Sequence, residues 1–295
     1  MLRTLDHVVV AVRDLEAATE TYRRLLGRDP SWRGRHPGAG TANALFRLEN
    51  VYLELLARDG DAPLAESLAP LFDREGLAAL AFGTGDAEAC AAAFRERGLP
   101  IAGSVDGRGA DSRTGAERRW RNVFLSPEGT RGVILFAIEQ RSPPEALPPA
   151  EPNAAAESAI SGIDHVVVQS GDPEAAIDLY RERLGLRLAL DRTFEQWGAR
   201  LLFFRIGGVT VEVAHALDGD PGAADHLWGI SWRSPDVTAA RERLAAAGFD
   251  VSEVRTGRKP GTRVFTVREG THGVATLVIG PESSAVSRFG RAGSR

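Results

Sequence analysis

Cysteine is nearly absent from this sequence: 295 residues contain one, Cys90. A single thiol excludes an internal disulfide framework and a cysteine-rich zinc site. Cys90 falls in a stretch whose pattern predicts a helix, where a small buried apolar residue is the ordinary interpretation. Stability and any metal chemistry must therefore come from other side chains.

Long apolar runs and a strong charge of one sign are missing too. No apolar run reaches the roughly 18 residues that a membrane span needs, and the N-terminus enters a predicted strand without a basic and apolar leader. The formal net charge is −4, with acids and bases evenly mixed, so nothing attracts nucleic acid or an anionic membrane over a distance. We expect a cytoplasmic monomer or homodimer whose partner is a small molecule, with neither nucleic acid nor membrane involved.

What the sequence does contain is an internal repeat. Residues 163–168 repeat residues 5–10, and residues 209–212 repeat residues 51–54. His7 and Glu54 recur as His165 and Glu212 at the same separation along the chain. A repeat of this length predicts two similar units.

The repeat and the composition between its copies predict the domain boundaries. The stretch between the copies is rich in proline, alanine and glutamate with no apolar period, which is typical of a linker. The last dozen residues are mostly serine, glycine and arginine, which favours disorder. The predicted organisation is a first domain at 1–141, a linker at 142–158, a second domain at 159–282 and a disordered tail at 283–295.

Each half divides further into two modules. In the first, Asp14 is a natural N-cap for a helix that Gly27 ends, and a hairpin follows. The segment 33–40 is rich in Gly and Arg and predicts a loop that could close over a ligand. The motif at 128–133 recurs at 269–274 and makes the second and fourth modules correspond. We predict an α+β fold of four βαβββ modules in two domains, each with a curved mixed sheet around a cup.

The predicted hairpins place polar residues on the inner face of the sheet. A two-residue turn at Glu49 and Asn50 puts Leu45 opposite Glu54. The Gly207 and Gly208 turn does the same in the second half. A buried Glu or Arg in mid-strand is unfavourable unless that face lines a polar cavity. The two inner faces are predicted to carry Asn43, Leu45, Arg47, Tyr52 and Glu54, and Leu201, Phe203, Arg205, Thr210 and Glu212.

With these residues in place, the chain resembles the vicinal oxygen chelate superfamily, which includes glyoxalase I, bleomycin and fosfomycin resistance proteins, methylmalonyl-CoA epimerase and extradiol dioxygenases. The resemblance rests on the four modules, with a His on the first strand and a Glu on the last, and covers residues 5 to about 280. Residues 1–141 resemble the glyoxalase-like branch with a Gly-rich segment before the third strand. Residues 159–281 resemble the plainer glyoxalase/dioxygenase type. The resemblance implies cups formed by paired modules, each holding a divalent metal (Fe, Mn, Ni, Co or Zn) that a substrate chelates through two adjacent oxygens. Carried over by position, the implied metal ligands are His7, Glu54, His165 and Glu212.

The sequence departs from the family pattern in the second and fourth modules. Ala79 and Gly229 stand where a His is expected, and Phe136 and Leu277 stand where a carboxylate is expected. Three interpretations follow. In the first, each half-site binds metal weakly and is completed by water, substrate or a loop residue such as His36. In the second, modules one and three face each other and share all four ligands. In the third, the cups bind an organic ligand without metal.

The favoured hypothesis is a metal-dependent lyase or isomerase acting on a small oxygen-rich metabolite. Glu54 or Glu212 would leave the metal and move a proton, so both are the predicted catalytic residues. The alternatives are a non-catalytic resistance protein that sequesters a drug, and a ring-cleaving dioxygenase, which needs two His and one carboxylate in one cup. Arg47 and Arg205 would bind a ligand carboxylate or phosphate, or else pair with the two glutamates. The predicted substrate-binding residues are Asn43, Arg47, Tyr52, Phe203 and Arg205.

Overall fold

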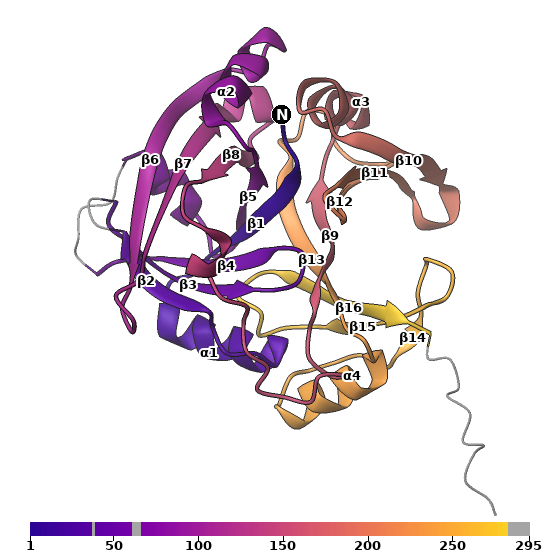
Figure 1. The fold of residues 1–295 in the computed structure, drawn as a ribbon. Coiled ribbons are helices and arrows are strands. Elements are labelled where there is room, and N and C mark those ends of the chain that lie inside the picture. The colour runs from indigo at the N-terminus through magenta and orange to yellow at the C-terminus, as the bar shows by residue number, and fades with distance from the viewer. Residues whose placement is uncertain (37–38, 61–65, 283–295) are drawn as a thin grey trace, which may run out of the picture.

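The computed structural model describes residues 1–36, 39–60 and 66–282. We call residues 4–140 the first half and residues 162–281 the second half. Within these described residues, each half contains eight strands and two α-helices. Figure 1 shows how they are arranged.

The strands and helices have the following bounds. The first half contains β1 (Thr4–Ala11), α1 (Leu15–Leu26), β2 (Trp32–His36), β3 (Thr41–Arg47), β4 (Tyr52–Arg58), β5 (Gly76–Gly83), α2 (Ala87–Glu96), β6 (Ile101–Asp111), β7 (Glu117–Leu125) and β8 (Ile134–Gln140). The second half contains β9 (Gly162–Gln169), α3 (Pro173–Ile177), a π-helical turn (Asp178–Arg183), β10 (Arg187–Phe194), β11 (Ala199–Ile206), β12 (Val209–Ala216), β13 (His226–Arg233), α4 (Val237–Ala246), β14 (Arg255–Thr256), β15 (Thr262–Val267) and β16 (Ala275–Pro281).

Local sequence signals set the ends of the first helix. The Asp14 carboxylate accepts a hydrogen bond from the Ala17 backbone N–H, and Gly27 adopts the left-handed backbone that ends the helix. The hairpin registers also agree with prediction. Leu45 pairs with Glu54 and Phe203 pairs with Glu212. The predicted α+β fold of two similar units with mixed sheets is confirmed.

The two sheets differ in closure. In the first half the strands form a closed barrel in the order β1-β4-β3-β2-β6-β7-β8-β5, whereas the second half is an open sheet in the order β10-β11-β12-β9-β13-β16-β15-β14. Strand β1 pairs antiparallel with β5, and β9 pairs antiparallel with β13. Neighbouring modules therefore form each sheet, and the alternative in which modules one and three share one cup is wrong.

The loop predicted at 33–40 is wrong for residues 33–36, whereas residues 39–40 form a turn. Residues 32–36 form β2, which pairs with β3 and, through Gly34 and Arg35, with β6. A Cβ on Gly34 would lie 2.4 Å from Trp32 Nε1 and 2.8 Å from the Ala110 carbonyl oxygen, so the glycine allows close strand contact. Gly34 therefore marks where the barrel closes. Residues 37–38 of the predicted loop, and the predicted tail at 283–295, lie outside the described residues.

The halves pack against each other through their helices and the outer faces of their sheets. One hydrophobic core includes Tyr22 and Leu25 of α1 together with Trp232 of β13. Figure 1 shows α1 near α4 at the bottom and α2 near α3 at the top. The Arg24 guanidinium donates to the Ala247 carbonyl oxygen, and that of Arg97 donates to the Arg183 carbonyl oxygen. The concave faces are left to line the two cups.

The segment between the halves is attached to the barrel. Arg47 donates hydrogen bonds to the carbonyl oxygens of Pro144 and Leu147. The Leu147 side chain is buried in a cluster with Trp32, Leu45 and Tyr52. A stretch with linker composition thus covers part of the barrel wall.

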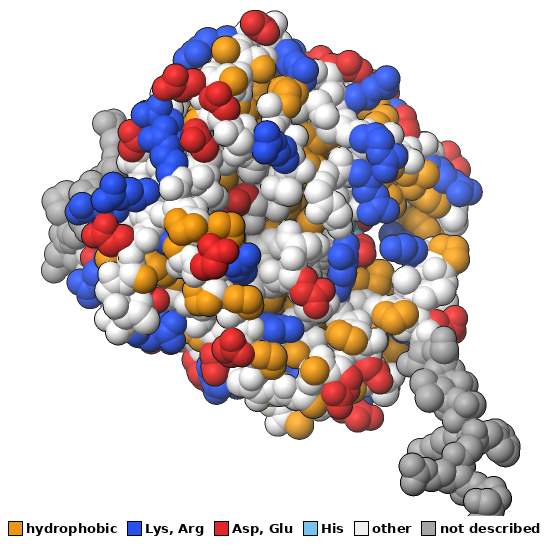
Figure 2. All heavy atoms as spheres, in the orientation of Figure 1, with side chains coloured by type: hydrophobic (Ala, Val, Ile, Leu, Met, Phe, Trp, Pro, Cys, Tyr) orange, Lys and Arg blue, Asp and Glu red, His pale blue; other side chains and the backbone are white. Residues whose placement is uncertain are grey.

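The outer surface has no segregation of charge on the face seen in Figure 2, where Lys and Arg side chains are interspersed with Asp and Glu. Among the described residues, no helix combines the length and apolar character needed to cross a membrane.

Candidate functional site

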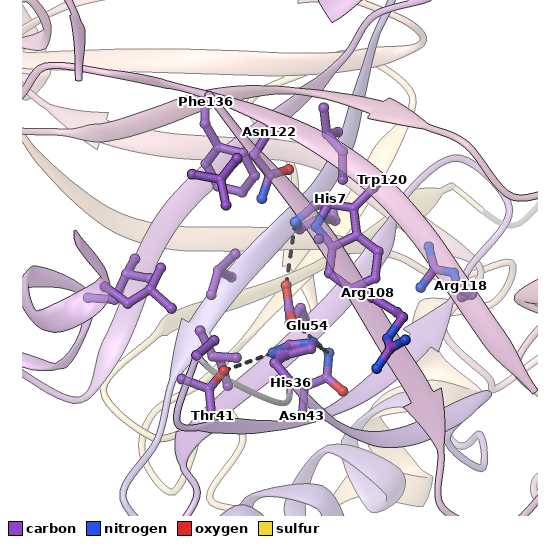
Figure 3. Close-up of a pocket in the computed structure, with 18 of the residues that line it drawn as sticks. His7, His36, Thr41, Asn43, Glu54, Arg108, Arg118, Trp120, Asn122 and Phe136 are labelled. Carbon is purple, nitrogen blue, oxygen red and sulfur yellow. Dashed lines mark hydrogen bonds and ion pairs between the residues drawn. The ribbon is translucent and has the colours of Figure 1, made fainter. Parts of the chain in front are cut away.

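The interior of the first-half barrel holds a cavity of about 320 Å³. Most of its wall is apolar, supplied by inward-facing residues of the strands and by Leu68 and Leu71 of the 3₁₀ segment Glu66–Phe72. The polar groups that line it, most of them labelled in Figure 3, are His7, His36, Thr41, Asn43, Tyr52, Glu54, Asp106, Arg108, Arg118, Trp120 and Asn122. A largely apolar cavity with a few convergent polar groups is typical of a small-molecule site.

His7 and Glu54 meet in this cavity. The His7 ring is 2% exposed, and its Nε2 lies 3.4 Å from Glu54 Oε2. The His7 Nδ1 lies 2.7 Å from Asp6 Oδ1. Tyr52 stacks on one side of the ring at a centroid distance of 4.4 Å, and Phe136 contacts it edge-on at 5.5 Å.

The contacts of His7 constrain where protons reside. Asp6 accepts the Nδ1 proton, because an ionised carboxylate cannot donate. The second ring nitrogen then faces the Glu54 carboxylate, and two lone pairs at this distance repel unless a proton lies between them. A proton taken up by Glu54 could therefore pass to His7 Nε2 across this contact.

A second set of hydrogen bonds holds Glu54 from the opposite side. The Asn43 amide N–H₂ donates to Glu54 Oε1 at 2.7 Å and contacts His36 Nε2 at 3.2 Å. His36 Nδ1 lies 2.8 Å from the Thr41 hydroxyl. Burial lowers the pKa of His36, and Arg118 adds to that effect while Glu54 opposes it. A neutral His36 accepts from Asn43 and fixes the amide that orients Glu54.

Replacing His36 by glutamine is expected to flatten the pH dependence of stability below neutrality. The folded-state pKa of His36 lies below the value near 6.5 of an unfolded chain. As pH falls below about 6.5, the unfolded chain binds this proton first, so the wild type loses stability until the folded-state pKa is passed. Urea midpoints of both proteins between pH 5 and 8 measure the effect, and parallel curves would contradict it.

Arg118, Trp120 and Asn122 alternate along β7 and form the wall opposite β1 and β4. The Arg118 side chain is 6% exposed. Its guanidinium donates to Gln140 Oε1 at 3.1 Å and lies over the rings of Trp32, Tyr52 and Trp120. Across the described part of the chain, no carboxylate oxygen lies within 4.0 Å of this guanidinium. A buried cation without an anionic partner thus faces the cavity.

Sequence reasoning missed Arg118, Asp6 and Gln140. The alternation Arg118, Trp120, Asn122 was a visible signal for one polar inner face on β7. The recurrence of Asp6 as Asp164, next to each repeated His, was the signal for the carboxylate that binds Nδ1. Nothing local pointed to Gln140, whose amide contacts Asp6 and the Tyr52 hydroxyl from the far end of β8.

The structure brings some of the predicted site residues together and separates others. His7, Asn43, Tyr52 and Glu54 all line the cavity. Arg47 does not, because its guanidinium binds the carbonyl oxygens of Pro144 and Leu147.

The second half repeats the central pair on an open sheet. His165 Nε2 lies 3.5 Å from Glu212 Oε2, and His165 Nδ1 lies 2.9 Å from Asp164 Oδ2. Burial raises the pKa of Glu212, with His165 and Arg258 acting in the opposite direction. Burial also acts to raise the pKa of Asp164, but the hydrogen bond from His165 and the nearby Lys259 and Arg233 outweigh it and hold the value at about 2.

The two predicted binding residues of this half lie on β11. Phe203 pairs directly with Glu212, and Arg205 pairs with Thr210 and with Arg187 of the edge strand β10. Pairing across an antiparallel ladder places Phe203 beside the carboxylate on one face of the sheet. Arg205 stands two pairs nearer to the Gly207 and Gly208 turn.

The side chains of each cup differ from the metal centre that the family resemblance implies. Val9 pairs with Glu54 and Ala81 pairs with Phe136, so Phe136 occupies the symmetry position of the carboxylate. Among the described residues, no three His, Cys, Asp or Glu side chains are close enough to hold a metal ion. The residues present therefore do not fit the two-His, two-carboxylate centre of the family, and a metal held by His7 and Glu54 stays a prediction.

Comparisons with known proteins agree with this architecture. Residues 5–159 match the family model described as a glyoxalase-like domain, and residues 162–275 match that of the glyoxalase/bleomycin resistance protein/dioxygenase superfamily. A curated relative, ethylmalonyl-CoA/methylmalonyl-CoA epimerase of Cereibacter sphaeroides, is 30% identical over 100 residues, which are 31% of this chain and 75% of the relative.

Two solved structures share the whole fold. A mutant of 4-hydroxymandelate synthase from Streptomyces coelicolor superimposes with a TM-score of 0.70 at 15% identity, covering 98% of this chain and 95% of the other. A hypothetical protein from Staphylococcus aureus gives a TM-score of 0.63 at 11% identity, with coverages of 93% and 98%. At these identities the likeness concerns the fold. With both halves matched by glyoxalase-type models, the chain belongs to the vicinal oxygen chelate superfamily, with a glyoxalase-like domain in its first half.

Proposed function

We propose that the first half is an enzyme that moves a proton on a small organic anion held inside the barrel. Arg118 would bind the carboxylate of the substrate, and the Glu54 and His7 pair would carry the proton. The observation that supports this most is the buried Arg118, which has no carboxylate partner among the described residues and lines the same cavity as Glu54.

A buried, unpaired guanidinium is unfavourable in a folded protein, because removing a charge from water costs several kcal/mol unless an opposite charge replaces the solvent. Gln140 supplies a neutral acceptor, and the rings of Tyr52 and Trp120 supply cation–π contact, but neither neutralises the charge. A ligand carboxylate would form two parallel hydrogen bonds with the guanidinium. The free protein is therefore poised to bind an anion.

The proton step uses groups already in contact. A substrate C–H next to a carbonyl group would transfer its proton to the Glu54 carboxylate, so that the C–H bond breaks, an O–H bond forms and the electron pair moves onto the carbonyl oxygen. His7, supported by Asp6, can take this proton from Glu54 and return it. Arg108 and Asn122 line the same cavity and offer donors to the developing oxyanion. Return of the proton to a different face or carbon gives an isomer.

The curated relative supports this class of chemistry. It is named as an epimerase of ethylmalonyl-CoA and methylmalonyl-CoA, which are acids with a carboxylate beside an exchangeable C–H. A cavity of about 320 Å³ suits the acyl part of such a molecule. We propose carboxylate-bearing carbon acids as the substrate class of this chain.

The test measures exchange with solvent. Protein purified without chelator is analysed for metal and then incubated in D₂O with methylmalonate, 2-oxobutyrate and a methylmalonyl thioester, while ¹H NMR follows the signal of the C–H. We expect exchange in at least one of these acids and a KM raised at least tenfold by Arg118→Gln. Arg119→Gln is the matched control, because Arg119 is the next residue of β7 and is exposed.

Three results would contradict the proposal. Binding of the acids without any exchange would indicate a non-catalytic binding protein. Exchange that requires a stoichiometric metal and stops with chelator would return the reaction to the metal-dependent hypothesis. Equal KM values for wild type and Arg118→Gln would remove Arg118 from substrate binding.

A further inference from the structure

The open sheet of the second half has two free edges that meet through side chains. Strands β10 and β14 lie at opposite ends of the sheet, and within the described chain no strand pairing joins them. Trp197 lies in the turn after β10, and Arg258 lies in the turn after β14. The Arg258 guanidinium carbon is 3.8 Å from the centroid of the Trp197 ring. We call this contact the clasp.

The clasp lies near the His165 and Glu212 pair. Burial raises the pKa of the Glu212 carboxyl, and the positive charge of Arg258 acts to lower it. His165 and Glu212 keep 18% and 16% of their side chains exposed, compared with 2% for His7 in the closed barrel. Solvent therefore reaches the His165 and Glu212 pair, which lies near the clasp.

Ser231 supplies an independent sign of a ligand. It pairs with His165 across β13 and β9, so both side chains stand on the same face of the sheet. The next residue, Trp232, points the other way into the core between the halves. The Ser231 hydroxyl is buried, and among the described residues it has no hydrogen-bond partner. Buried polar groups are normally satisfied, so this hydroxyl has a hydrogen bond to offer to a ligand group.

Charge and aromatic surface indicate the class of ligand. Lys259 Nζ and Arg233 Nε lie 4.0 and 3.6 Å from Asp164 Oδ1. Together with Arg258, which acts on Glu212, they make three cations beside the two carboxylates of Asp164 and Glu212. Trp197 is 38% exposed, and its ring stacks on Phe194 at a centroid distance of 4.3 Å, which fixes the plane of the indole. A fixed aromatic face beside an excess of cations suits a planar anion.

We propose that the second half carries a separate binding site for a planar aromatic carboxylate. The ring of the ligand stacks on Trp197 in the place of the Arg258 guanidinium. Arg258 and Lys259 then bind its carboxylate, and Ser231 offers its hydroxyl to a polar substituent. This site does not depend on the reaction proposed for the first half.

The experiment uses benzoate as the probe and the full chain. Calorimetric titrations compare the wild type with Trp197→Ala, Arg258→Gln and Arg258→Lys, with Arg241→Gln on α4 as the matched control. Every titration is repeated in an Arg118→Gln background, so that benzoate held in the first-half cavity is counted separately. Cyclohexanecarboxylate tests the need for a planar ring.

We expect benzoate affinity to fall at least tenfold with Trp197→Ala and Arg258→Gln and to be partly restored with Arg258→Lys. Arg241→Gln should bind as the wild type does, and cyclohexanecarboxylate at least fivefold more weakly than benzoate. Absence of benzoate binding in the Arg118→Gln background would overturn the proposal. Equal affinities for the Trp197 and Arg258 variants, or for the two probes, would overturn it as well.

Discussion

Glu54→Gln is expected to lower the rate of proton exchange by about 10²- to 10⁴-fold, the range typical of removing a general base. Glutamine keeps the shape of the side chain, and its carbonyl oxygen can still accept from the Asn43 amide, as Glu54 Oε1 does at 2.7 Å. It cannot take up a proton. Because Arg118 is untouched, the loss should appear in kcat with KM changed little. Initial rates of C–H exchange over a range of substrate concentrations measure both constants.

The matched control for this variant is Glu117→Gln, at the exposed start of the same β7 strand that carries Arg118. It removes one carboxylate charge outside the cavity and should exchange protons at the wild-type rate. Loss of activity in both variants would mean that net charge or folding explains the Glu54 effect. Retention of more than a tenth of the wild-type kcat in Glu54→Gln would remove Glu54 from the role of base.

Much of the site could be predicted because the repeat fixes residues relative to one another. The equal separation of His7 from Glu54 and of His165 from Glu212 implied one geometry made twice, and the structure gives 3.4 and 3.5 Å for the two pairs. The hairpin turns set register, and register decides which side chains share a face. Local rules of helix capping and turn formation were therefore sufficient for β1, α1, β3 and β4.

These local rules do not predict contacts between segments that are distant in the sequence. Strand β2 pairs with β6 across a long separation along the chain, so its glycine and two arginines were interpreted as part of a loop. The guanidinium of Arg47 turns to carbonyl oxygens about a hundred residues away instead of to the cavity. Arg118 is buried only because the barrel closes around it. Closure of the barrel depends on pairing between distant strands, which a local sequence pattern does not predict.

The two cups have diverged in the way a duplication allows. The first has an enclosed cavity, a nearly inaccessible histidine and a buried cation. The second keeps the same pair on an open sheet whose edges meet at Trp197 and Arg258. Excluding water strengthens electrostatic interactions, which favours proton transfer in the closed cup. An open, cationic cup is better suited to reversible binding.

Trp232→Ala is expected to destabilise the whole chain by about 3 kcal/mol, near the lower end of the range for removing a buried aromatic side chain. Trp232 is completely buried between the halves, where its ring meets that of Tyr22 edge-on at 6.5 Å. The value lies near the lower end because its indole N–H has no partner among the described residues, and removing an unsatisfied donor offsets part of the lost packing. Urea unfolding followed by circular dichroism measures the change.

Trp228→Ala is the matched control on the same strand, because Trp228 is 48% exposed and its removal should change stability by about 0.5 kcal/mol or less. Since one core contains residues of both halves, including Tyr22 and Trp232, we expect a single unfolding transition that shifts as a unit in Trp232→Ala. Two separate transitions in the wild type, with only the second-half transition shifted by the substitution, would show that each half folds on its own core. The contacts of α1 with β13 and α4 would then hold the halves side by side without coupling their stability, and closure of the first barrel would owe nothing to the second sheet.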